Sequence, residues 1–345
     1  MKGRDAGRPI SRRTFAGAAS ALMTSLLAMP GWAQEGAASQ SAASESAASQ
    51  GNSGAGAGAS PDVTSLKTQT EVNRLTTEVF VNGKGPYKFV VDTGAERSVL
   101  ADTVVRDLGL TPSGRANVQG LILKIPTDLV TIDTLRYGSF SREKLVVPVL
   151  PSGLLGGDGC LGLDIINGTR ITFAFKDQTI RIQKPGSFMA TDWDATVVVI
   201  RGAGKGGRLR SNVCSVDGVK TVAFIDTGSE STIGNMSLFR ALSSGDHPDV
   251  GAAILQGATG GEATGRLTPV KIIELQGLLF EDGTIVVSDV PDFDQWGVYS
   301  KPAILIGMDF LRKFASVTID YQHKEITFEL ARAQINDKPP RVVVT

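Results

Sequence analysis

The segments "FVVDTGAERSVL" (Phe89–Leu100) and "AFIDTGSESTIG" (Ala223–Gly234) repeat one pattern within a single chain. In both, apolar residues run directly into Asp-Thr-Gly, and the two aspartates, Asp92 and Asp226, stand 134 residues apart. One Asp-Thr-Gly would carry little information, because such tripeptides are common in turns. Two copies in matching surroundings indicate an internal duplication.

A pair of short strands precedes each Asp-Thr-Gly. The stretches "EVFVNGKGPYKFVV" (Glu78–Val91) and "NVCSVDGVKTVAFI" (Asn212–Ile225) place a tight turn, Asn82–Gly85 or Asp217–Gly218, between two apolar segments. Asn-Gly and Asp-Gly tolerate the positive φ that two-residue hairpin turns require. The sequence therefore predicts a β-hairpin whose second strand ends at each aspartate.

A second matching segment follows each aspartate. "GCLGLDIINGTRITFAFKDQTIRI" (Gly159–Ile182) and "AILIGMDFLRKFASVTIDYQHKEITFEL" (Ala303–Leu330) both have an apolar pair closing on a glycine, Gly162 or Gly307. A short helical turn and two strands are expected after each glycine. The repeats predict an N-terminal lobe at residues 67–184, a connector at 185–194, a C-terminal lobe at 195–332 and a tail at 333–345.

The composition is that of a folded protein rich in strands. Of 345 residues, 41% are hydrophobic and 20% charged, and the 40 glycines suit short strands joined by tight turns. Lys plus Arg and Asp plus Glu both number 35, so no net field favours nucleic acid. Two cysteines, Cys160 and Cys214, and two histidines, His247 and His323, offer no metal-site spacing, and we predict neither metal nor cofactor. The sequence leaves open whether the cysteines pair.

The first 66 residues lie outside the expected fold. Residues 1–33 have a basic start, an uncharged apolar stretch and small residues at Ala33, which is typical of an export signal, and "SRRTF" (Ser11–Phe15) is similar to a twin-arginine signal. Residues 34–66 are mostly Ala, Ser and Gly, which predicts a flexible linker. We therefore expect a periplasmic or secreted protein with no membrane association after cleavage of the signal.

The paired Asp-Thr-Gly segments, each with a later apolar-apolar-Gly, resemble the retropepsin-like branch of the aspartic peptidases. The resemblance spans both lobes and implies an all-β fold of two closed β-barrel lobes related by a pseudo-twofold axis, with the active site in the cleft between them. It also implies an endopeptidase acting on peptides or unfolded proteins. Because one chain carries both halves, we expect a monomeric pseudo-dimer; pairing of each lobe with a second chain is the alternative.

Two aspartates are what metal-free peptide hydrolysis needs. Carboxyls held about 3 Å apart share one proton, because like charges prevent both from ionising. The ionised member then accepts a proton from water while the protonated member donates one to the scissile carbonyl. Asp92 and Asp226 are the predicted catalytic pair. The rival hypothesis is a binding module of the same fold that has lost turnover.

Supporting roles follow for the residues around the pair. Gly94 and Gly228 allow tight turns that bring backbone N–H groups to the carboxyls. By the resemblance, Thr93 and Thr227 bond across the axis to the opposite loop, and Gly162 and Gly307 brace the active loops from behind.

One residue distinguishes the two active loops. Ala95 follows the first glycine, whereas Ser229 follows the second. By the resemblance, Ser229 would hydrogen-bond to Asp226, which would make Asp226 the more stable anion and Asp92 the proton carrier.

Substrate is expected to lie extended beneath mobile hairpins, or flaps. In the second lobe, "LQGATGGEATG" (Leu255–Gly265) is glycine-rich, and Gly257, Gly260 and Gly261 are the candidate flap residues. The first-lobe equivalent has a single glycine, Gly120, which departs from the pattern and leaves open whether both flaps close or only the second.

Two other segments resemble functional motifs without their context. "GAGKGG" (Gly202–Gly207) matches a dinucleotide-binding pattern, but a further strand follows where a helix would be needed, so a hairpin turn is favoured. "DVPDFDQW" (Asp289–Trp296) is acidic but lacks calcium-loop spacing, so a solvated insertion is expected.

Overall fold

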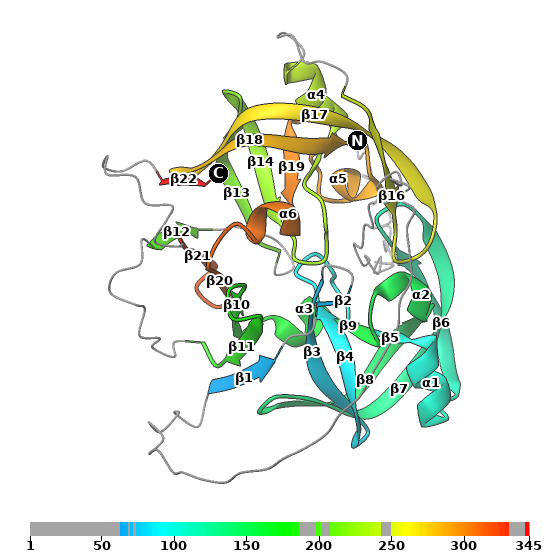
Figure 1. Cartoon of the computed structure of the whole chain (residues 1–345). Coiled ribbons are helices and arrows are strands. Elements are labelled where there is room, and N and C mark those ends of the chain that lie inside the picture. Colours follow the sequence, from blue (N-terminus) through cyan, green and yellow to red (C-terminus); the bar gives the residue numbers. More distant parts are fainter. Residues whose placement is uncertain are drawn as a thin grey trace, which may run out of the picture.

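The computed structural model describes residues 63–67, 70–71, 74–185, 197–201, 208–242, 250–330 and 342–344. These residues form mainly strands, in three sheets (Figure 1). The predicted signal peptide, most of the predicted linker and connector, and "GAGKGG" lie outside the described residues. The all-β fold class is confirmed.

The first lobe is a closed barrel. Its sheet has the order β2-β3-β4-β9-β5-β8-β7-β6, and an additional β3–β7 pairing closes the ring. The strands are β2 Thr70–Glu71, β3 Arg74–Val81, β4 Lys84–Val91, β5 Val99–Ala101, β6 Pro112–Gln119, β7 Lys124–Tyr137, β8 Phe140–Leu150 and β9 Gly159–Leu161. Three short helices accompany them: α1 Asp102–Leu108, α2 Ser152–Leu155 and α3 Leu163–Ile166.

The second lobe repeats this plan, as two lobes related by duplication should. Its sheet has the order β16-β17-β13-β14-β19-β15-β18-β22, closed by β17–β18. The strands are β13 Arg210–Val216, β14 Val219–Ile225, β15 Ile233–Gly234, β16 Ala252–Gln256, β17 Glu262–Leu275, β18 Leu278–Val287, β19 Ala303–Ile306 and β22 Val342–Val344. The helices are α4 Met236–Leu242, α5 Pro291–Gln295 and α6 Met308–Leu311.

A third sheet joins the lobes. It has the order β1-β11-β10-β20-β21-β12 and takes strands from both halves of the chain. They are β1 Val63–Lys67, β10 Arg170–Ala174, β11 Thr179–Gln183, β12 Val197–Arg201, β20 Ser316–Asp320 and β21 Glu325–Glu329. At its centre Thr172 pairs with Thr318, and their hydroxyl oxygens lie 2.8 Å apart. Equivalent residues of the two lobes therefore face each other, as a pseudo-twofold axis requires.

The ends of the described chain differ from the predicted boundaries. β1 begins at Val63, inside the range predicted as linker, and pairs with β11. β22 lies in the range predicted as tail and pairs in parallel with β18. Both segments add a strand to an existing sheet edge, where unpaired backbone groups are available.

The hairpin turns ahead of the aspartates have the predicted geometry. Asn82 and Gly83 have φ of 49° and 78°, and Asp217 and Gly218 have φ of 46° and 82°. The side chains of Asn82 and Asp217 also accept hydrogen bonds from backbone N–H groups of β7 and β17, respectively. Each turn is thus tied to the long strand beside it, which fixes the hairpin that carries the aspartate.

The cysteines, the one described histidine and the helices bear on further expectations from the sequence. Cys160 and Cys214 are both buried, and they form no disulfide bond with each other. His323 lies in the turn between β20 and β21, 3.0 Å from an Asp320 oxygen. No helix in the described part of the chain has the length and apolar character that a membrane span needs.

The acidic segment 289–296 is not a solvated insertion, and that interpretation is wrong. It contains α5, in which the side chains of Asp292 and Phe293 are 2% and 0% exposed. Phe293 belongs to an apolar cluster of the second lobe. Burying Phe293 draws the neighbouring carboxyl of Asp292 into the interior as well.

Candidate active site

Asp92 and Asp226 occupy equivalent positions at the ends of β4 and β14. Each lies immediately after its strand, and each is 1% exposed. The parallel neighbours β9 and β19 hold them, because Asp92 N–H donates to Leu161 O and Asp226 N–H to Ile306 O, both at 3.0 Å. The duplication therefore delivers two carboxyls on matching supports.

Thr93 and Thr227 lock the two loops together across the axis. Each threonine N–H donates to the hydroxyl of the other, at 3.2 Å from Thr93 and 3.0 Å from Thr227. The Thr93 hydroxyl donates to Ile225 O at 3.0 Å, and the Thr227 hydroxyl to Val91 O at 2.8 Å. Four hydrogen bonds thus join segments from opposite lobes in the arrangement that the sequence predicted.

Gly94 and Gly228 lie against the carboxyl of the opposite lobe. A Cβ added to Gly94 would be 2.7 Å from Asp226 Oδ2, and one added to Gly228 would collide with the Asp92 carboxyl. Each glycine also donates its N–H at 2.8 Å to the aspartate of its own loop. The close approach of the two carboxyls depends on the absence of a side chain at both glycines.

The environments of the two carboxyls differ. Asp92 Oδ1 accepts hydrogen bonds from Gly94 N–H and Ala95 N–H, whereas Asp226 Oδ2 is buried with no hydrogen-bond partner. Burial, and then the charge of Asp92, raise the pKa of Asp226 well above its ordinary value. The raised pKa favours Asp226 as the holder of the shared proton, and the pair titrates as a unit.

The raised pKa of Asp226 favours the opposite of the predicted division of roles. The Ser229 hydroxyl donates to the Ser231 carbonyl oxygen at 2.8 Å, along its own loop. The prediction of Asp226 as the more stable anion rested on that hydroxyl, and the raised pKa of Asp226 does not favour it.

Gly162 and Gly307 pass directly behind the active loops. A Cβ on Gly162 would lie 2.6 Å from the Arg97 carbonyl carbon, and one on Gly307 would lie 2.6 Å from the Ser231 carbonyl oxygen. The residues after them donate N–H bonds of 2.8 Å to the loops, Leu163 to Ala95 O and Met308 to Ser229 O. Only glycine fits at positions 162 and 307, where the chain passes behind the active loops.

The sequence interpretation missed two side-chain pairs that complete this brace. Ser98 and Thr232 donate their hydroxyls to Asp164 and Asp309, at 2.8 Å and 2.6 Å. The same hydroxyl oxygens accept the N–H groups of the brace glycines. The signal was present in the repeat, because a hydroxyl residue stands six positions after each catalytic candidate and an aspartate two positions after each brace glycine.

The two predicted flaps are the turns after β6 and β16, and their tips touch. Thr259 Oγ1 donates a 2.7 Å hydrogen bond to Leu123 O across the lobes. Gly120 lies against the Thr259 side chain, and a Cβ on Gly261 would be 2.6 Å from Leu123 Cγ. Figure 1 shows the loop after β16 reaching toward β6. The tips of the two flaps are therefore in contact in this structure.

The flap residues are not equivalent in their contacts. Gly257 faces the backbone of Ile122 in the opposite flap, whereas Gly260 faces Leu154 of α2 and has a φ of +85°. Leu121, which the sequence interpretation overlooked, is fully buried in the apolar cluster of the second lobe. Other members of that cluster are Phe224, Ile233, Leu255, Val290, Phe293 and Leu305. The first-lobe flap is thus anchored in the opposite lobe through its apolar tip.

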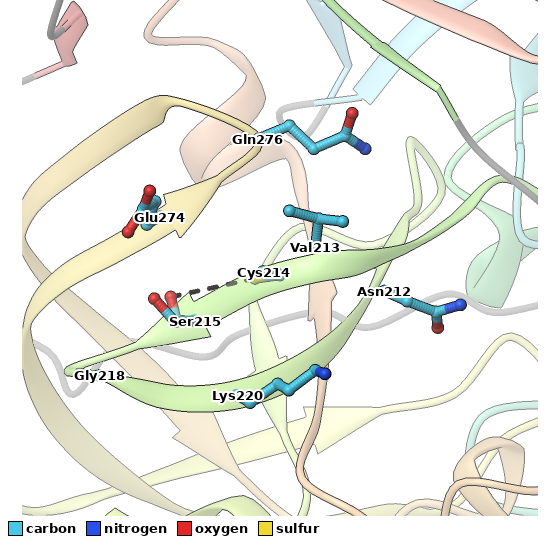
Figure 2. Close-up of a pocket in the computed structure, with 8 residues that line it drawn as sticks. All are labelled: Asn212, Val213, Cys214, Ser215, Gly218, Lys220, Glu274 and Gln276. Carbon is cyan, nitrogen blue, oxygen red and sulfur yellow. Dashed lines mark hydrogen bonds between the residues drawn. The ribbon is translucent and has the colours of Figure 1, made fainter.

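A separate hollow of about 320 Å³ lies on β13, β14 and β17 (Figure 2). It is lined by Asn212, Val213, Cys214, Ser215, Gly218, Lys220, Glu274 and Gln276. None of the predicted site residues borders it. Burial raises the pKa of the Cys214 thiol to about 12, which leaves it protonated and unreactive at neutral pH.

Comparison with known protein families agrees with this geometry. A family model described as aspartyl protease matches residues 77–165 and 213–310, one region in each lobe. A comparison with curated proteins finds no match. The two matched regions cover more than half of the chain and include both Asp-Thr-Gly loops and both brace glycines. The chain belongs to the aspartyl protease family.

Proposed function

We propose that the protein is an aspartic endopeptidase that cleaves peptide bonds with a water molecule activated between Asp92 and Asp226. The observation that carries the proposal is the reciprocal packing of Gly94 on the Asp226 carboxyl and of Gly228 on the Asp92 carboxyl. This packing brings together two buried carboxyls in unequal environments, which is the arrangement that assigns one to acid and one to base.

The surroundings of the two carboxyls support Asp92 as the general base and Asp226 as the general acid. Ionised Asp92 removes a proton from water, and the resulting hydroxide adds to the scissile carbonyl carbon. Protonated Asp226 donates its proton to the carbonyl oxygen as the tetrahedral intermediate forms. Collapse of that intermediate re-forms the carbonyl, returns a hydroxyl proton to Asp226 and breaks the C–N bond, and the amine leaves with the proton that Asp92 had taken up.

The proposal is tested by incubating the purified protein with an unstructured protein and a broad peptide library from pH 3 to pH 8. We expect internal cleavage that depends on one carboxyl being protonated. Because the pKa of Asp226 is raised, the active protonation state persists above the ordinary carboxyl range and is lost as the pH rises through that raised pKa. Binding of peptides without cleavage at any pH would favour the binding module.

Residues 1–33 support the further proposal that the protein is exported to the periplasm or secreted. The proposal of a monomeric pseudo-dimer is supported by the pairing of both Asp-Thr-Gly loops within one chain, since the Thr93 and Thr227 bonds are already satisfied internally. Size measurement in solution checks the second point, because a dimer that is required for activity would contradict it.

Closure of the flaps provides a prediction about substrate handling. Gly261→Ala should lower kcat/KM by about 10- to 100-fold, because the added Cβ would collide with Leu123 and displace the flap that orients the peptide. Gly277→Ala is the matched control, since Gly277 has a similarly positive φ of +94° but no atom within 4 Å of the added Cβ. Equal activity of the two variants would show that contact between the flaps is not needed.

A further inference from the structure

Arg208 joins the second lobe to the first active loop. It comes shortly before β13, and its guanidinium Nη2 donates a 2.7 Å hydrogen bond to the carboxylate of Glu96. Glu96 stands four residues after Asp92. The Arg208 and Glu96 side chains are 13% and 30% exposed, so solvent reaches little of this ion pair. A charge-assisted bond that is shielded in this way holds its partners more firmly than an exposed ion pair.

An aromatic ring of the second lobe holds the guanidinium in place. The guanidinium carbon of Arg208 lies 5.4 Å from the centre of the Trp296 ring, which is within the range of a cation–π contact. The Trp296 ring lies 4.4 Å, between centroids, from the ring of Phe224, two residues before Asp226. A planar guanidinium can contact a ring face and a carboxylate together. Arg208 therefore reaches the first lobe from a supported position on the second.

The residue after Arg208 holds the strand of the second aspartate. Leu209 is buried, and its carbonyl oxygen accepts the N–H of Ile225 at 3.3 Å. Ile225 immediately precedes Asp226, and its own carbonyl oxygen accepts the hydroxyl of Thr93. Arg208 and Leu209, two successive residues, thus bond to the two segments that carry the two carboxyls.

The place of Glu96 on its loop explains what this bond adds to the threonine bonds. Those bonds join the lobes at Thr93 and Thr227, directly after each aspartate, and alone they would let one lobe rotate against the other. Glu96 is fixed to its own lobe, because its carbonyl oxygen accepts the N–H of Asp164 at 3.2 Å. The bond from Arg208 is a second attachment, away from the threonines, and it opposes that rotation.

We propose that Arg208 is a positioning residue of the active centre, which sets the separation of the Asp92 and Asp226 carboxyls by fixing the first active loop to the second lobe through Glu96. The inference rests on the proposed peptidase function. The separation decides how strongly the carboxyls share a proton, because their repulsion falls as they move apart. It also decides whether one water molecule can contact both carboxyls in the geometry that the reaction needs.

The test compares Arg208→Met with Arg106→Met in the purified protein. Arg106 also bonds a carboxylate, that of Asp102, but these two side chains are 72% and 46% exposed. Arg208→Met should lower kcat by about 10- to 100-fold and change KM little, because the carboxyls are misaligned while the peptide still binds. Arg106→Met should follow the wild type, since exposed ion pairs contribute little. A folded Arg208→Met with the kcat of the wild type would overturn the proposal.

A double-mutant cycle shows whether the effect passes through Glu96. Glu96→Gln should also lower kcat, and the double variant should lose no more than the more affected single variant, because both changes break one bond. Losses that simply add would overturn the proposal. If Arg208→Met does not fold, Glu96→Gln tests the same bond from the other lobe.

A measurement without substrate separates this proposal from the peptidase function. Carbon NMR of the aspartate carboxyls gives the two titration midpoints of the pair, whose separation reflects the repulsion between the carboxyls. Arg208→Met should bring the two midpoints closer together. An unchanged separation would overturn the role of Arg208, even if both midpoints move in one direction because a positive charge was lost. A smaller separation in a protein that cleaves no peptide would contradict only the proposed function.

Discussion

Replacing either Asp92 or Asp226 by Asn is expected to lower kcat/KM for peptide cleavage by at least about 10³-fold, since each change removes one half of the acid–base pair. Asn keeps the size of Asp but cannot exchange a proton. The measurement is cleavage of the best library peptide by both variants and the wild type. Substantial turnover by either single variant would rule out the shared pair.

The stability of Asp226→Asn distinguishes lost chemistry from lost fold. The folded-state pKa of Asp226 lies above the ordinary value of 3.8, so the folded protein binds more protons than the unfolded chain. Its stability is therefore penalised as the pH rises above about 4 toward the raised pKa. Asn carries no such penalty. We expect Asp226→Asn to be inactive yet more stable than the wild type near neutral pH, as measured by thermal unfolding.

Gly228→Ala is expected to reduce kcat by about 10²-fold or more, because the new methyl would collide with the Asp92 carboxyl and force the pair apart. Gly94→Ala should act in the same direction through Asp226, with its added Cβ 2.7 Å from Asp226 Oδ2. Overpacking of this kind also costs about 1–3 kcal/mol of stability, so thermal unfolding must be followed alongside kinetics.

A glycine without these neighbours is the control for both variants. An added Cβ at Gly153 meets no atom within 4 Å, so Gly153→Ala should retain wild-type activity and stability. If Gly228→Ala remains folded and fully active, the carboxyls do not depend on the close approach of the two loops. A folded Gly228→Ala whose kcat and pH profile match those of the wild type, and whose KM alone differs, would also contradict the prediction.

The hairpins ahead of the aspartates, and the glycines that pass behind the active loops, were predictable because they depend on local sequence. Asn82–Gly83 and Asp217–Gly218 specify their turns through residues that accept positive φ. Gly162 and Gly307 were found by comparing the repeats. The same comparison contained the Ser98–Asp164 and Thr232–Asp309 pairs, whose role became clear only from their bonds behind the active loops.

Contacts between segments far apart in sequence were not predictable. The repeats gave no indication that β10 and β20 join in one sheet, since an edge strand's partner depends on how the lobes dock. The anchoring of Leu121 in the second lobe has the same origin. Asp292 was misinterpreted because an acidic sequence suggests solvent, whereas the packing of Phe293 and Trp296 decides that its carboxyl is buried.

The sequence by itself determined the duplication, the two lobes and the two aspartates, because each is encoded by a short pattern written twice. The tertiary structure decided the surroundings that raise the pKa of Asp226. Local sequence pointed to Ser229, but the pKa of a carboxyl depends on the solvent and charge around it, and those are set by residues from both lobes. The burial of Asp226 and the nearby carboxyl of Asp92 exist together only once the chain has folded.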